Sequence, residues 1–65
     1  MNMKLKIEIE TYNEAFFDSP SAECARILKD LAGRIEVSEM GIEIGDRLAL
    51  MDINGNRVGE AKVTK

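Results

Sequence analysis

Hydrophobic and polar residues alternate strictly near the start of the chain. From Met3 to Ile9 every odd position is apolar, whereas the even positions from Lys4 to Glu10 carry lysines and then glutamates. A repeat of two is typical of a β-strand with one buried face, because successive side chains point to opposite sides. The sequence therefore predicts a half-buried strand over residues 3–11.

A second pattern, with the period of a helix, begins after residue 19. Ser19 is suited to the N-cap, and Pro20 to the first helical position, where its missing N–H loses no partner. The apolar positions lie within an arc of about 100° and are Cys24, Ile27, Leu28, Leu31 and Ile35. The opposite face should be solvated, and its residues are Glu23, Arg26, Lys29, Asp30, Arg34 and Glu36. Gly33 lies on this outer face and is expected to mark fraying of the last turn.

The last third of the chain carries a hairpin signal, Asn54-Gly55, between two apolar stretches. This dipeptide is preferred in two-residue type I′ turns, since both central residues need positive φ. Such a turn would place Leu50 opposite Gly59 and Met51 opposite Val58. The expected core face consists of Leu48, Leu50, Gly59, Ala61 and Val63. The expected outer face consists of Arg47, Ala49, Met51, Val58, Glu60, Lys62 and Thr64.

These elements predict one small α+β domain over residues 1–65, in the order β-α-β-β. The helix should cover one face of a three-stranded, mainly antiparallel sheet, with strand order 1-3-2 or, alternatively, 1-2-3 with a right-handed crossover. Either Phe16 or Phe17 should close the end of the core. Residues 37–46 contain Gly41 and Gly45 and are expected to form a loop, to which the sequence assigns no role.

Composition limits the chemistry available to the chain. It has 65 residues, a net charge of −3, no histidine and a single cysteine. A domain of this size has little stability to spare, and no internal disulfide can form, so a homodimer is expected. Cys24 lies on the apolar helical face without a histidine nearby, which predicts an inert thiol. No apolar run is long enough to span a membrane, no signal peptide is expected, and an unpaired cysteine fits a reducing cytoplasm.

No catalytic residue, cofactor site or metal site is predicted, and the chain is not expected to be an enzyme. Asp52, Asn54 and Asn56 have the spacing of the first ligands of an EF-hand loop. That motif then needs glycine and a bidentate glutamate where this chain has Arg57 and Val63. Asp52 and the two asparagines are therefore interpreted as turn formers.

Two surfaces are candidates for binding. Met51, Ile53 and Val58 would form an apolar group on the outer hairpin face, and we expect this group to contact a second copy or another protein. The alternative is a nucleic-acid-associated accessory protein that uses a basic patch on the outer sheet face. The patch would consist of Lys4, Lys6, Arg47 and Lys62. The net negative charge argues against this alternative.

Several segments resemble known sequences. They are Lys4 to Glu10, Asn13 with Ala15-Phe16, Ala25-Arg26-Ile27-Leu28 with Leu31-Ala32, and Asp52-Ile53-Asn54-Gly55-Asn56-Arg57-Val58-Gly59. Through them the chain resembles small, uncharacterised proteins encoded by bacteriophages and prophages. The resemblance implies a soluble protein in the host-cell cytoplasm and implies no activity. We expect a non-enzymatic interaction or regulatory protein that binds another protein, for which a host factor is a natural target.

Overall fold

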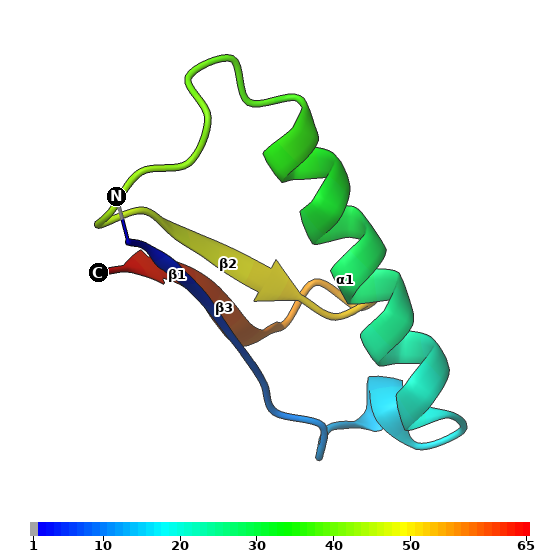
Figure 1. The fold of residues 1–65 in the computed structure, drawn as a ribbon. Coiled ribbons are helices and arrows are strands. Elements are labelled where there is room, and N and C mark those ends of the chain that lie inside the picture. Colours follow the sequence, from blue (N-terminus) through cyan, green and yellow to red (C-terminus); the bar gives the residue numbers. More distant parts are fainter. Residues whose placement is uncertain (1) are drawn as a thin grey trace.

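A computed structural model describes residues 2–65 (Figure 1). Its elements are β1 (Lys4–Ile9), the 3₁₀-helix η1 (Glu14–Phe16), α1 (Pro20–Glu36), β2 (Arg47–Met51) and β3 (Arg57–Thr64). The three strands form one antiparallel sheet in the order β1-β3-β2, and α1 lies against one of its faces. The α+β prediction and the 1-3-2 order are confirmed, which excludes the alternative order 1-2-3.

The start of α1 follows the predicted capping pattern. The Ser19 hydroxyl oxygen accepts a hydrogen bond from the backbone N–H of Ala22 at 3.1 Å, and Pro20 is the first helical residue. The helix runs through Gly33 to Glu36, and the Val37 N–H donates to the Gly33 carbonyl beyond its end. Gly33 therefore lies within regular helix, and the expected fraying is not present.

A β-bulge in β3 changes the predicted pairing of the hairpin. Leu50 lies opposite Gly59 as expected, but the next residue, Met51, lies opposite Arg57. Val58 is thus an extra residue in β3, and its side chain turns to the helix side, where it is only 6% exposed. The prediction that Met51 and Val58 face each other on the outer surface is wrong.

The turn itself also differs from the type I′ prediction. Gly55 has a φ of 84°, but no residue other than glycine has positive φ among those the structure describes, so Asn54 does not adopt the type I′ conformation. The Gly55 N–H donates to the Asp52 carbonyl, and the Asp52 N–H donates to the Asn56 carbonyl at 2.8 Å. The result is a three-residue loop with glycine at its left-handed position, the next most common hairpin connection.

The core lies between α1 and the helix-facing side of β2 and β3. Its buried members are Phe16, Ile27, Leu31, Leu50, Val58, Ala61 and Val63. Phe16 closes the core from η1, whereas Phe17 is exposed. Cys24 is only partly buried at the border of the core, and Leu28 is exposed.

Gly59 is required by a close approach of two strands. A Cβ atom at this position would lie 1.9 Å from the backbone carbonyl oxygen of Glu8 in β1. The sequence placed Gly59 beneath the helix, but the backbone of the neighbouring strand occupies the space of its missing side chain. Ala61, two residues further on, is fully buried in the core as expected.

Candidate functional site

A buried carboxylate organises the loop between β2 and β3. Asp52 is only 4% exposed. Its Oδ1 accepts hydrogen bonds from the backbone N–H groups of Asn54 at 2.9 Å and Asn56 at 2.8 Å. Its Oδ2 accepts from the side-chain amides of Asn13 at 2.8 Å and Asn56 at 3.3 Å. These donors explain why the loop is longer than the two-residue turn, and they support the interpretation of Asp52, Asn54 and Asn56 as turn formers.

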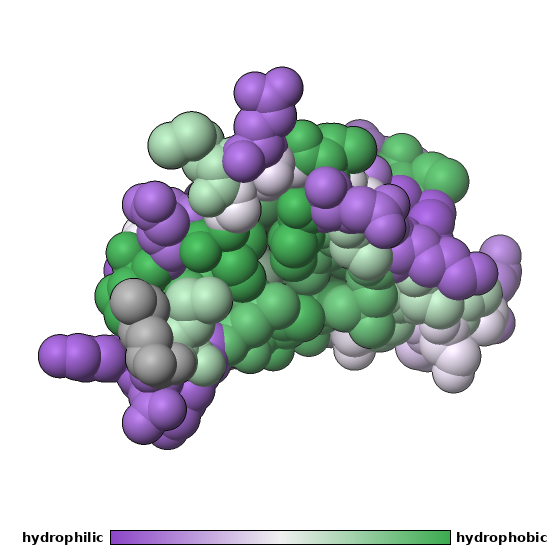
Figure 2. Space-filling model, turned by 45° about the horizontal axis from the view of Figure 1, so that its top comes forward, coloured by the Kyte–Doolittle hydropathy of each residue, from purple (hydrophilic) through white to green (hydrophobic). Residues whose placement is uncertain are grey.

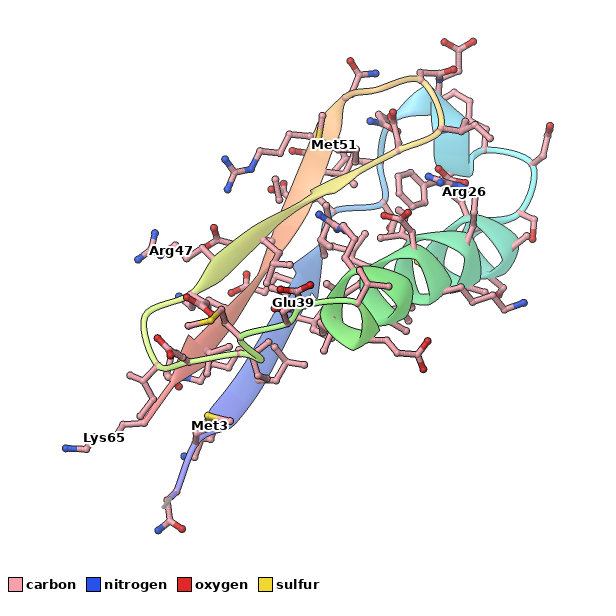
Figure 3. All side chains as sticks on the ribbon, turned by 90° about the horizontal axis from the view of Figure 1, so that it is seen from above. Met3, Arg26, Glu39, Arg47, Met51 and Lys65 are labelled. Atoms are coloured by element: carbon pink, nitrogen blue, oxygen red, sulfur yellow. The ribbon has the colours of Figure 1, made fainter. Side chains whose placement is uncertain are left out.

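A second carboxylate ties this loop to the helix. Glu23 was expected on the solvated face, but it is 7% exposed and lies against the loop. It accepts two hydrogen bonds from Arg26, at 2.8 and 3.0 Å, and one from the Ile53 N–H at 2.9 Å. Arg26 also donates to the Met51 carbonyl at 3.1 Å, and it lies between α1 and the loop in Figure 3. The outer-face prediction for Glu23 is wrong because these contacts rotate the helix towards the hairpin.

Hydrogen bonds keep both buried acids ionised. Hydrogen bonding from Arg26 lowers the pKa of Glu23 below its ordinary value, with a further contribution from the Ile53 N–H, against the opposing effect of burial. Burial raises the pKa of Asp52, but the hydrogen bonds from Asn56, Asn13 and Asn54 outweigh it, so this pKa is also lowered. An acid that stays ionised at neutral pH is a poor proton donor there. We therefore assign these two carboxylates a structural role.

The outer face of the sheet brings the predicted basic residues together. The strand register places Lys6 opposite Lys62, and Lys62 opposite Arg47, so three cations lie in one row across the three strands. Arg47 projects from β2 on the side away from the helix (Figure 3). Lys4, opposite Thr64, lies on the same face of β1, two residues before Lys6. We call Lys6, Lys62 and Arg47 the basic row.

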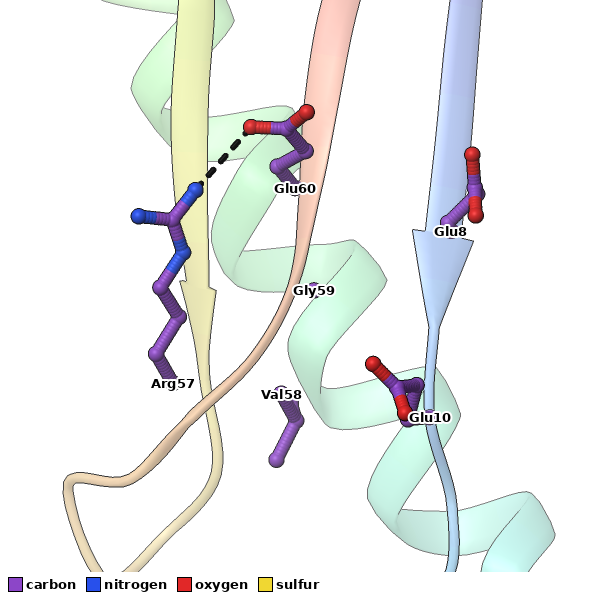
Figure 4. Close-up of a pocket in the computed structure, with 6 residues that line it drawn as sticks. All are labelled: Glu8, Glu10, Arg57, Val58, Gly59 and Glu60. Carbon is purple, nitrogen blue, oxygen red and sulfur yellow. Dashed lines mark hydrogen bonds and ion pairs between the residues drawn. The ribbon is translucent and has the colours of Figure 1, made fainter.

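An acidic region adjoins the basic row on the same face. Glu8 lies opposite Glu60, and Arg57 contacts Glu60 at 2.9 Å. An open depression of about 360 Å³ is lined here by Glu8, Glu10, Arg57, Val58, Gly59 and Glu60 (Figure 4). The outer face is therefore divided into a basic half and an acidic half.

The predicted apolar interface of Met51, Ile53 and Val58 is not assembled. Met51 is exposed on the outer face opposite Arg57, and Ile53 is exposed in the loop. Val58 belongs to the core on the other side of the sheet. The bulge at Val58 separates the three residues, since it moves one of them to the opposite face.

The structure places a larger apolar surface at the other end of the molecule. Met3, Leu5 and Ile7 point to the helix side of β1 yet remain 40–43% exposed. Beside them, residues Met3, Met40, Ile42, Glu43 and Ile44 line an open depression of about 490 Å³. Met40 is 83% exposed and Ile44 is also exposed. We call Met3, Leu5, Ile7, Met40 and Ile44 the open apolar strip.

The position of the helix explains why the strip is open. Glu23 and Arg26 hold α1 over the β2–β3 loop, so the side of the helix that carries Leu28 points away from the loop. From there the ribbons of the helix and the sheet diverge towards residues 37–46 (Figure 1). Figure 2 shows a continuous apolar area on this side, bordered by polar residues. The strip was not predicted, because the helix was expected to cover this face of the whole sheet; the alternation of Ile42 and Ile44 in the loop was the available signal.

Comparisons with known proteins found no match among protein-family models, curated proteins or solved structures. Within residues 2–65 there is no group of three histidine, cysteine or acidic side chains that could hold a metal ion. The helix described by the structure is not long and apolar enough to cross a membrane.

Proposed function

We propose that this protein acts by binding another protein, without catalysis, through the open apolar strip. The observation that carries this proposal is the exposure of Met3, Leu5 and Ile7 on the face of β1 that the fold directs towards its own core. A contiguous exposed apolar area with a polar border is typical of a protein-binding surface. We further propose, from the phage origin expected on sequence alone, that the partner is a host protein in the cytoplasm.

The strip suits a partner that offers an apolar segment. Met3 and Met40 line the same depression, and their flexible, polarisable side chains adapt to partners of different shape. Leu5 and Ile7 follow Met3 along the chain, are carried on a regular strand and provide a fixed apolar base. We expect the partner to insert an apolar helix face or strand between β1 and the loop.

A pair of variants tests this proposal. The chain is used to capture proteins from the host cell, and the captured protein is then produced separately and titrated by calorimetry. A Met40→Glu/Ile44→Glu double variant should weaken binding at least tenfold, because two charges would be desolvated in the contact. Both side chains are exposed, so circular dichroism should show an unchanged fold.

Ile53→Ser is the matched control, since Ile53 is equally apolar and exposed but lies at the opposite end of the molecule. It should bind the partner as tightly as the unchanged protein. Equal binding by the Met40→Glu/Ile44→Glu variant, or a loss of binding with Ile53→Ser alone, would contradict the proposed surface.

A second candidate function is nucleic-acid association, and the basic row is the observation that favours it. Lys6, Lys62 and Arg47 could each neutralise a phosphate, so binding to random DNA should weaken with salt with a slope of about −0.9 per contact. Lys62→Glu should then abolish binding. The adjacent Glu8 and Glu60 repel phosphates, which is why this function ranks second.

A further inference from the structure

The outer edge of β1 is available for another strand. The sheet order makes β1 an edge strand, paired with β3 on one side. The Glu10 N–H donates to the Val58 carbonyl. Because backbone polar groups alternate in direction along a strand, the N–H and C=O groups of the other even-numbered residues of β1 also point towards β3. The N–H and C=O groups of Leu5, Ile7 and Ile9 therefore point outward, where they can form a second ladder.

Like charges face each other across the strands of a single chain. Lys6 lies opposite Lys62, which lies opposite Arg47, and Glu8 lies opposite Glu60. Like charges directly opposite each other destabilise a sheet. An added strand beside β1 would relieve both repulsions if it placed an acid next to Lys6 and a base next to Glu8.

We propose that a second copy of this chain pairs antiparallel along β1, with the two Ile7 residues opposite each other on a two-fold axis. This register places Lys6 opposite Glu8 and Lys4 opposite Glu10 of the other copy. On the helix side it places Leu5 opposite Ile9, so apolar residues also meet apolar residues. Both outward-facing sets of backbone groups are satisfied at the same time.

The neighbouring registers are disfavoured by charge. Moving the axis by one residue places Lys6 opposite Lys6, or Glu8 opposite Glu8. In the proposed register the basic row of one copy continues directly into Glu8 and Glu60 of the other. The lysines and glutamates of two β1 strands therefore pair with opposite charges throughout only when the two Ile7 residues lie opposite each other.

The paired sheet has six strands, with both helices on the same face. It brings the two open apolar strips side by side, which widens the surface that a partner would meet. This last consequence rests on the proposed function, whereas the pairing of the two β1 strands does not.

Charge exchange tests the register. In sedimentation equilibrium at low salt, Lys6→Glu and Glu8→Lys should each weaken the dimer at least tenfold, since each creates a like-charge pair across the axis. The double variant Lys6→Glu/Glu8→Lys should restore the dimer to within about threefold of the unchanged protein. Each single variant also removes a repulsion within its own chain, so urea midpoints of the monomers should not fall.

Cross-linking tests the position of the axis. With Cys24→Ser as background, Ile7→Cys should form a disulfide-linked dimer under mild oxidation. Leu5→Cys is the matched control, because the two copies of residue 5 would lie four strand positions apart, beyond the reach of a disulfide.

The proposal is overturned by a monomer at all concentrations, by a double charge variant that fails to recover the dimer, or by equal cross-linking of Ile7→Cys and Leu5→Cys. The Met40→Glu/Ile44→Glu variant separates this proposal from the proposed function. It should retain the dimer, so a loss of partner binding there leaves the pairing of β1 in place.

Discussion

The two ends of this molecule are held together in different ways. At the closed end, defined by the β2–β3 loop and the first turns of α1, Asp52 and Glu23 bind side chains and backbone from three separate segments. At the open end, residues 37–46 make local hydrogen bonds, such as that between Gly41 and Ser38, and Gly45 and Asp46 form backbone hydrogen bonds with Val63 of the sheet. The helix is therefore fixed to the sheet at the closed end, and it leaves β1 uncovered at the open end.

This difference separates stability from binding. The closed end contains the buried polar groups, which must keep their partners because an unpaired buried group is costly. The open end contains apolar side chains that the folded chain already leaves exposed to water, so their burial against a partner would be favourable. Substitutions should therefore affect folding at the closed end and association at the open end.

The largest effect is expected at Gly59 in β3, where the backbone of β1 leaves no room for a side chain. Gly59→Ala should destabilise the protein by about 3 kcal/mol or more, because the new Cβ would overlap the Glu8 carbonyl oxygen and force two backbones apart. Urea denaturation followed by circular dichroism measures the change. An unchanged midpoint would show that the two strands are not paired so closely in solution.

A smaller loss is expected at the tip of the closed end. Gly55→Val should cost about 2 kcal/mol, since Gly55 has positive φ and a β-branched side chain is strained there even though the surrounding space is open. Gly55→Asn is the matched control and should lose less than half as much, because asparagine tolerates the left-handed region. Equal losses would mean that strain at this position is not the cause.

The closed end should also be sensitive to acid. The pKa values of Glu23 and Asp52 are lower in the folded state than their ordinary values of 4.5 and 3.8, so the folded protein binds fewer protons than the unfolded chain. Their contribution to stability is therefore complete above those values and is lost as pH falls below them. Urea midpoints measured from pH 7 to pH 2 should show this decrease.

Asp52→Asn should be less stable at pH 7 and should show a weaker dependence on pH. Asp30→Asn serves as the control, since Asp30 is an exposed acid in an ion pair with Arg34 on the helix surface. Its pH profile should match that of the unchanged protein. If Asp52→Asn retained the full acid dependence, the stabilisation would have to come from other carboxylates.

Much of the fold was predictable because it depends on local pattern. Alternation identified β1, the Ser19-Pro20 pair located the start of α1, and the order of elements favoured the 1-3-2 sheet. The bulge at Val58 was not predictable, because the Asn54-Gly55 signal suits two loop lengths and the choice between them was made by Asp52. Its carboxylate binds two N–H groups of the longer loop, a preference that hydrophobic pattern does not contain.

The candidate sites show the same limit. The basic row was predicted because strand order and register are enough to bring Lys6, Lys62 and Arg47 together. The open apolar strip was missed because it depends on the rotation of α1 about its axis. That rotation follows from the contact between Glu23 and the Ile53 N–H, thirty residues apart in the sequence.

The smallest effect is expected in the second half of α1, towards the open end. Gly33 has no neighbouring atom that an added Cβ would meet, and it lies within regular helix. Gly33→Ala should therefore leave the protein equally stable or stabilise it by up to about 1 kcal/mol, because alanine loses less backbone entropy on entering a helix. A stability loss comparable to that of Gly55→Val in the same urea experiment would mean that neighbouring atoms pack against Gly33 in solution and that the open end is not loosely packed. An unchanged or higher midpoint, together with the loss at Gly55, would locate the folding constraint at the closed end and leave the open end free to bind.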